Sequence, residues 1–172
     1  MKKSKIQKII EYIPIMFVIF IICGIIYFSL EMIFRGRSDW TMFICAGLIG
    51  VLASTLNNVF TYEMLFQEQI FIGTVIATLL EGITGEIIKF FNNGINPVWD
   101  YSQIKNDFIR SACFFDGQCN FFFSLIWAGL IVVAILVGDS IDYYVFKNEP
   151  QPYYKISGNK TLFRLPKLKN NF

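Results

Sequence analysis

The chain has 172 residues, of which 55% are hydrophobic and 16% are charged, and its formal net charge is +2. Soluble domains usually contain about 45–50% apolar residues, so this composition excludes an ordinary soluble domain and predicts a membrane protein of one domain. The small net charge gives no indication of nucleic-acid binding, and we expect no nucleic-acid partner.

The sequence contains no histidine. Histidine is the usual acid–base catalyst near neutral pH and the commonest metal ligand. The four cysteines form no CxxC pair, and we therefore expect no metal site, no cofactor and no catalytic site. Cys113 and Cys119 share one loop, where a disulfide could form if the loop faces an oxidising compartment.

Apolar segments predict about four transmembrane helices, because about 20 residues of helix cross the hydrocarbon core of a bilayer. The expected spans cover residues 13–34, 40–61, 69–90 and 120–138. They form a transmembrane domain at 13–146, between a basic N-terminal segment at 1–12 and a basic, irregular tail at 147–172. The expected fold is an all-α membrane protein, a helix bundle with a long polar loop before its last helix.

The second expected span carries a stripe of small residues. Ala46, Gly50 and Ser54 recur every four residues, so they share one face of a helix. Small residues let membrane helices approach each other closely. We therefore expect this face to pack against neighbouring helices.

Two glutamates, Glu81 and Glu86, interrupt the third expected span. A carboxylate at mid-span costs roughly 2.5–3.5 kcal/mol on insertion scales, and such residues usually face a bundle interior or a wet cavity. The pair therefore marks a candidate functional site. Packing alone is the alternative interpretation, because Thr74, Thr78 and Gly82 form a small and polar face on the same helix.

The alternating direction of the helices predicts where polar residues meet. The ends of the first and third spans and the starts of the second and fourth fall in one half of the membrane, beside the loop at 91–119. We expect them to form one pocket. Its candidate residues are Glu31, Arg35, Glu81, Gly85, Glu86, Trp99, Asp100, Tyr101, Gln118 and Ser124. A purely structural ion pair, such as Glu31 with Arg35, is the alternative.

The basic residues predict the orientation of the chain. Of the 15 Lys and Arg residues, ten lie before the first span or in the tail, and five lie in segments that would face the other side. Loops rich in Lys and Arg usually stay in the cytoplasm. We therefore expect a multi-pass protein of the cell membrane with both termini in the cytoplasm.

Several motifs, taken together and in order, resemble one known family. They are Glu31 with Arg35, Arg37-Ser-Asp-Trp-Thr-Met42, Glu81-Gly-Ile-Thr-Gly85, Trp99-Asp-Tyr-Ser102, and Gly117-Gln118 with Ser124-Leu-Ile-Trp127. From Glu31 to Tyr154 the chain resembles the ABC-transporter type IV family, small multi-spanning membrane proteins labelled ABC-transporter permeases. The run Gly117-Gln118-Cys119-Asn120 departs from the family pattern by being one residue tighter. The resemblance implies a four-helix membrane protein with a permease-type label.

An ABC transporter needs an ATPase, and the phosphate-binding motif Gly-x-x-x-x-Gly-Lys-Ser/Thr is absent from this sequence. If the family label holds, the chain is only the membrane component, and a separate ATPase subunit must dock on it. The other expected partners are the lipid bilayer and further copies of the chain, because four short helices make a small pathway.

Three functions stay open at this point. The first is a transporter or permease component whose carboxylates bind a cation or a proton. The second is a structural or accessory membrane subunit whose polar residues only lock the helices. The third is a membrane-embedded enzyme or lipid-binding protein with Glu81 as general base. We favour the transport component and expect no enzymatic activity, because no nucleophile with an activating base is visible.

Overall fold

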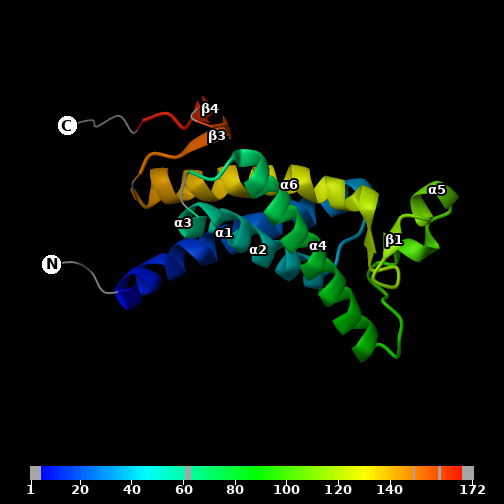
Figure 1. Cartoon of the computed structure of the whole chain (residues 1–172). Helices are drawn as coiled ribbons and strands as arrows, with labels where there is room; N and C mark the ends of the chain where they lie inside the picture. The colour runs from blue at the N-terminus through cyan, green and yellow to red at the C-terminus, as the bar shows by residue number, and fades with distance from the viewer. Residues whose placement is uncertain (1–4, 61–62, 149, 159, 168–172) are drawn as a thin grey trace.

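The computed structural model describes residues 5–60, 63–148, 150–158 and 160–167, and it is mostly helical (Figure 1). Parts of the expected basic ends, residues 1–4 and 168–172, lie outside the described residues. The bundle is made of α1 (Lys5–Arg35), α2 (Trp40–Ser54), α4 (Phe66–Phe91) and α6 (Phe121–Ser140). Helix α2 packs against α1, α4 and α6, and α4 also packs against α6.

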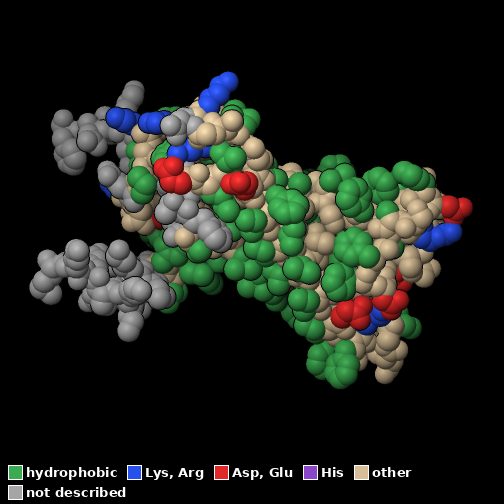
Figure 2. Space-filling model, viewed as in Figure 1, with side chains coloured by type: hydrophobic (Ala, Val, Ile, Leu, Met, Phe, Trp, Pro, Cys, Tyr) green, Lys and Arg blue, Asp and Glu red, His purple; other side chains and the backbone are tan. Residues whose placement is uncertain are grey.

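Three helical segments are long and apolar enough to cross a membrane. They are Tyr12–Arg35, Phe66–Phe91 and Phe121–Val145, the last of which joins α6 to a π-helical turn, η2 (Ile141–Val145). Figure 2 shows hydrophobic side chains over the middle of the visible face and most charged side chains towards its two ends. This distribution is compatible with an integral membrane protein.

The structure does not confirm a fourth span, because α2 has only 15 residues. A short helix, α3 (Leu56–Phe60), follows it after Thr55. The hydroxyls of Ser54 and Thr55 donate to the carbonyl oxygens of Val51 and Leu52. Such side-chain hydrogen bonds to the preceding turn compete with regular helix, which explains why α2 ends before the expected residue 61.

The small-residue stripe of α2 packs as expected. Ala46, Gly50 and Ser54 are all buried. A Cβ atom at Gly50 would overlap the side chain of Cys23 in α1, and a Cβ atom at Gly138 of α6 would overlap Ser54. The absence of side chains at these two glycines therefore lets α2 approach α1 and α6 closely.

The loop before α6 contains short elements that the sequence analysis did not predict. They are a 3-10 turn, η1 (Tyr101–Gln103), the one-turn helix α5 (Asp107–Arg110), and an antiparallel pair of β1 (Cys113–Phe114) with β2 (Cys119–Asn120). Asn120 then caps α6 by accepting a hydrogen bond from the backbone N–H of Phe122. Cys113 and Cys119 are free thiols, like the other described cysteines.

The expectation of an irregular tail was wrong for much of the tail. Strands β3 (Tyr153–Ser157) and β4 (Lys160–Arg164) form an antiparallel hairpin. The buried ring of Tyr154 packs against Phe66 of α4 and Phe163 of β4, with centroids 4.9 and 4.6 Å apart. An isolated hairpin is marginally stable, so its contact with the bundle decides that the segment folds.

The two non-helical parts lie at opposite ends of the bundle. In Figure 1 the hairpin lies at the end where α1 begins, where β3 packs against α4, and the loop with β1 and α5 lies at the other end. The candidate site described next belongs to the end with the loop.

Candidate functional site

The centre of the candidate site is Glu81 on α4, which is 1% exposed. Its Oε1 accepts a hydrogen bond from the Tyr101 hydroxyl at 2.8 Å, and its Oε2 accepts one from the indole N–H of Trp127 at 3.0 Å. Both donors are neutral, and none of the ion pairs among the described residues includes Glu81. Buried carboxylates are usually paired with a cation, so this arrangement is uncommon.

Tyr101 reaches Glu81 from the loop. Its backbone N–H donates to the carbonyl of Gly117 at 2.9 Å, and its ring stacks on Phe123 with centroids 4.6 Å apart. Asp100 caps the turn by accepting from the backbone N–H of Ser102 at 2.9 Å. Burial, together with the charge of Glu81, raises the pKa of Tyr101 far above its usual range. The Tyr101 hydroxyl therefore acts as a neutral donor.

Trp127 reaches Glu81 from α6. Its ring stacks almost parallel on Tyr27 of α1, with centroids 5.1 Å apart and an interplanar angle of 4°. Tyr27 fixes the plane of the indole and therefore the direction of its N–H group. Glu81 on α4 thus contacts both α6 and the loop. The stacking of Trp127 on Tyr27 connects this group to α1 as well.

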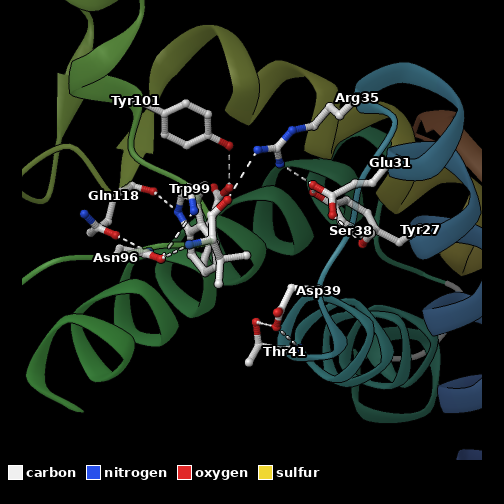
Figure 3. Close-up of polar contacts among 12 residues, drawn as sticks. Tyr27, Glu31, Arg35, Ser38, Asp39, Thr41, Asn96, Trp99, Tyr101 and Gln118 are labelled. Atoms are coloured by element: carbon white, nitrogen blue, oxygen red, sulfur yellow. Dashed lines mark hydrogen bonds and ion pairs between the residues drawn. The ribbon is translucent and has the colours of Figure 1, made fainter. Parts of the chain in front are cut away.

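A second buried carboxylate, Glu31, lies near the end of α1. Arg35 donates to its Oε1 at 2.6 Å and Ser38 donates to its Oε2 at 2.7 Å. Arg35 also donates to the carbonyl oxygen of Val98 at 3.4 Å. Figure 3 shows the Arg35 guanidinium beside the Glu31 carboxylate. Unlike Glu81, Glu31 therefore has a compensating positive charge.

The Glu31–Arg35 pair borders a small cavity. The cavity has a volume of about 190 Å³. Its lining residues are Glu31, Arg35, Arg37, Ser38, Asp39, Pro97 and Val98. This cavity is polar and lies where α1 and α2 meet the loop, whereas Glu81 lies deeper in the bundle and does not line it.

A third group of polar residues fixes the loop to α4. Asn96 donates to Oε1 of Gln118 at 2.6 Å, and the Trp99 indole donates to the backbone carbonyl of Gln118 at 3.0 Å (Figure 3). A Cβ atom at Gly85 would lie 2.5 Å from Gln118 Oε1. Because Gly85 has no side chain, the Gln118 amide can pack directly against the backbone of α4.

The structure brings most of the predicted residues to this end of the bundle, in three connected groups. Glu81 contacts Tyr101, Glu31 pairs with Arg35, and Gly85 packs beside the Gln118–Trp99 contact. Ser124 accepts a hydrogen bond from Thr78, three residues before Glu81, at 3.1 Å. Asp100 caps the turn that presents Tyr101, and its hydrogen bonds within the described part of the chain go to Ser102 and Gln103 rather than to either carboxylate site.

Glu86 is not part of this arrangement, contrary to the sequence-based expectation. Its side chain is 47% exposed and lies 3.6 Å from the ammonium group of Lys89. Five residues of helix turn the chain through about 140° beyond one full turn. That rotation places Glu86 on a different face of α4 from Glu81.

The candidate residues drawn from the sequence did not include Trp127, Asn96 and Ser38. They also left out Tyr27, although its spacing places it on one helix face with Glu31 and Arg35. A signal was present for Trp127, which follows Ser124 by three residues and so shares its helix face. The contacts of Asn96 and Ser38 depend on the path of loops, which helical periodicity does not describe.

Comparisons of the chain with protein-family models, with curated proteins and with solved structures found no match, so the family resemblance stays a prediction.

Proposed function

We propose that this chain is the membrane component of a transporter and that Glu81 binds and releases a proton during its working cycle. The observation that supports this proposal is the buried Glu81 carboxylate, which has two neutral donors and no cationic partner among the described residues. Ionisable residues inside membrane spans commonly mark ion pathways and proton relays. Arg35 already balances the charge of Glu31, the other buried carboxylate at this end, whereas the charge of Glu81 would be balanced by a proton.

The contacts of Glu81 favour a proton over a metal ion. Each carboxylate oxygen already accepts a hydrogen bond from Tyr101 or Trp127. A metal ion such as Ca²⁺ takes six or more oxygen ligands, and the Trp127 indole N–H that contacts Glu81 offers no ligand atom. A proton needs only one lone pair, and a protonated carboxyl group can donate to the Tyr101 oxygen without moving either ring.

Protonation would also change how the loop is held. The hydrogen bond between Glu81 and Tyr101 would be weaker with a neutral carboxyl group than with a carboxylate, because hydrogen bonds to charged groups are about twice as strong. Tyr101 would then be held less firmly, while Arg35 still binds the Val98 carbonyl of the same loop. In this proposal the loop opens at Tyr101 and gives Glu81 access to the polar cavity at Glu31 and Arg35.

The membrane topology in this proposal is the one that the basic residues predict. The apolar helix α2, continued by α3, makes the fourth crossing, and both termini face the cytoplasm. The separate ATPase implied by the family resemblance would dock at the end of the bundle that carries the β3–β4 hairpin. Further copies of the chain would complete a pathway larger than one bundle provides.

The test is infrared difference spectroscopy of the purified full-length protein in lipid nanodiscs between high and low pH. We expect a protonated-carboxyl band that the Glu81→Gln variant lacks. Glu86→Gln is the matched control, because it makes the same change at an exposed, paired glutamate of the same helix. A spectrum in which no band depends on Glu81, over the pH range where the protein stays folded, overturns proton binding.

Transport itself is tested with the protein and whatever co-purifies with it after gentle extraction from native membranes. We expect an ATPase or a second membrane subunit in stoichiometric amount. We also expect proton movement in proteoliposomes of the wild-type complex and none with Glu81→Gln at equal membrane insertion. Unchanged flux in the variant would overturn the proposal.

A structural role is the second candidate, and a specific observation favours it. Glu81 receives its two hydrogen bonds from different elements, η1 and α6, so it could serve only to lock them on α4. This candidate predicts that Glu81→Gln lowers stability and that the wild type shows neither a titrating band nor a co-purifying subunit.

A further inference from the structure

A second buried carboxylate without a positive partner lies at the opposite end of the bundle. Asp139, near the end of α6, is 4% exposed. Its Oδ2 accepts hydrogen bonds from the Asn57 amide at 2.7 Å and from the Tyr154 hydroxyl at 2.6 Å. Both donors are neutral, and no ion pair in the described part of the chain includes Asp139.

Two buried amide oxygens in this half of the bundle have no partner in the described part of the chain. Oδ1 of Asn57 and Oε1 of Gln69 have no hydrogen-bond donor among the described residues. The two residues are 5% and 1% exposed. A buried acceptor without a partner costs about 1–3 kcal/mol, so two such oxygens in one protein require an explanation.

The orientation of Asn57 follows from its contact with Asp139. The amide nitrogen donates to the carboxylate, and the opposite orientation would place the amide oxygen against a negative charge. The free Oδ1 therefore belongs to the same amide group that touches Asp139. This unpartnered oxygen is therefore part of the group that binds the carboxylate.

Gln69 reaches the same end of the bundle from α4. Its amide nitrogen donates to the carbonyl oxygen of Met64 at 3.2 Å, which leaves Oε1 as the free end. Gln69 follows Phe66 by three residues, and the Phe66 ring packs on Tyr154, the residue that donates to Asp139. Figure 1 shows α3, β3 and the end of α6 gathered at this end of the molecule.

We propose that Asp139, Asn57 and Gln69 form a binding site for one monovalent alkali cation. All three residues offer oxygen ligands, which suit hard cations. One carboxylate balances one positive charge, so a bound monovalent ion would leave a neutral site, as burial in an apolar bundle requires. The ion would also give the two amide oxygens the partner that they lack.

Tyr154 links this site to the tail. Its hydroxyl fixes the Asp139 carboxylate, and its ring is enclosed by Phe66 and Phe163. A cation at Asp139 would stabilise the charged carboxylate to which the Tyr154 hydroxyl of the hairpin donates. We therefore expect cation binding to hold the β3–β4 hairpin on the bundle. This inference is independent of the proton proposed at Glu81.

The test measures binding of radioactive Na⁺, and of radioactive Rb⁺ as a substitute for K⁺, to the purified full-length protein. A parallel thermal unfolding series replaces NaCl or KCl by N-methyl-D-glucamine chloride at constant ionic strength. We expect saturable binding of at least one ion and a higher unfolding temperature in its salt. No saturable binding of either ion, with equal unfolding temperatures in all three salts, overturns the site.

Three variants make the test specific. Asp139→Asn should abolish binding, and Gln69→Met, which keeps the size of the side chain, should weaken binding by about tenfold or more. Asp142→Asn is the matched control, because Asp142 is the next acid along the chain and pairs with Asn148 instead. If Asp139→Asn does not fold, Gln69→Met decides. Wild-type affinity in a folded Gln69→Met variant, or equal losses in Gln69→Met and Asp142→Asn, contradicts the proposal.

Discussion

The indole N–H of Trp127 donates to Oε2 of Glu81 at 3.0 Å, across a sequence separation of 46 residues. This bond joins two of the three helices that are long enough to cross a membrane, and it does so at a carboxylate buried between them. Interactions of charged groups in a medium of low polarity are stronger than in water. The contact should therefore contribute measurably to the stability of the bundle.

Replacing Trp127 by Phe tests this contribution. The phenyl ring can still stack on Tyr27, but Glu81 loses one donor, and we expect the free energy of unfolding to fall by about 1–3 kcal/mol. Unfolding in mixed detergent micelles measures the change. Trp40→Phe is the control, since Trp40 is largely exposed and should change stability little. Equal effects of the two substitutions would show that the bond to Glu81 contributes nothing.

Gly85→Ala tests the close contact between α4 and the loop. The added Cβ atom would lie 2.5 Å from Gln118 Oε1, and we expect a loss of about 1–3 kcal/mol from overpacking. Gly129→Ala is the matched control on α6, where a Cβ atom meets nothing within 4 Å. It should be neutral or stabilise by up to about 1 kcal/mol, because alanine favours helix over glycine. Hydrogen exchange of residues 96–118 should rise only in Gly85→Ala.

The two loop cysteines should differ in reactivity. Cys119 is fully buried, and burial raises its pKa to about 12, with the charge of Glu81 adding to the effect. The thiolate is the reactive form of cysteine, so a maleimide should label partly exposed Cys113 much faster than Cys119. Single-cysteine variants and mass spectrometry measure the two rates.

The same reagent tests the orientation of the chain. A membrane-impermeant maleimide applied to intact cells should label Cys113 if the loop faces outwards, as the basic residues predict. Labelling of Cys113 only after the cells are opened would reverse the orientation. Faster labelling of Cys119 than of Cys113 would contradict the arrangement of the loop.

Acid should loosen the β3–β4 hairpin. A hydrogen bond from Lys155, with one from Tyr153, lowers the pKa of Glu63 below its ordinary value of 4.5. A carboxyl group whose pKa is lowered by folding stabilises the fold above its unfolded pKa, and this stabilisation disappears as the pH falls through the folded pKa. Hydrogen exchange of residues 153–164 should therefore accelerate between about pH 5 and pH 3.

Glu63→Gln provides the control for this experiment. Glutamine does not titrate, so exchange in the hairpin should already be faster at neutral pH and should show a smaller further change in acid. An acid response that is the same in the variant and the wild type would assign the effect to another group.

Much of the candidate site could be predicted from the sequence, because it depends on local features. Glu81 stands out because a charge inside an apolar helix is costly. The pairing of Glu31 with Arg35 follows from a spacing of four residues, which places both on one helix face. The same periodicity predicted the small-residue stripe of α2.

The sequence by itself therefore determined the apolar helices, the buried carboxylate on α4 and the end of the bundle where polar residues gather. Only the tertiary structure decided that Trp127 and Tyr101 bind Glu81, that Glu86 lies outside the site, and that the tail folds as a hairpin. It alone also joined Asp139 to Asn57, 82 residues away. Helical periodicity fixes which residues share a face, whereas contacts between distant segments depend on how helices, loops and strands pack against one another.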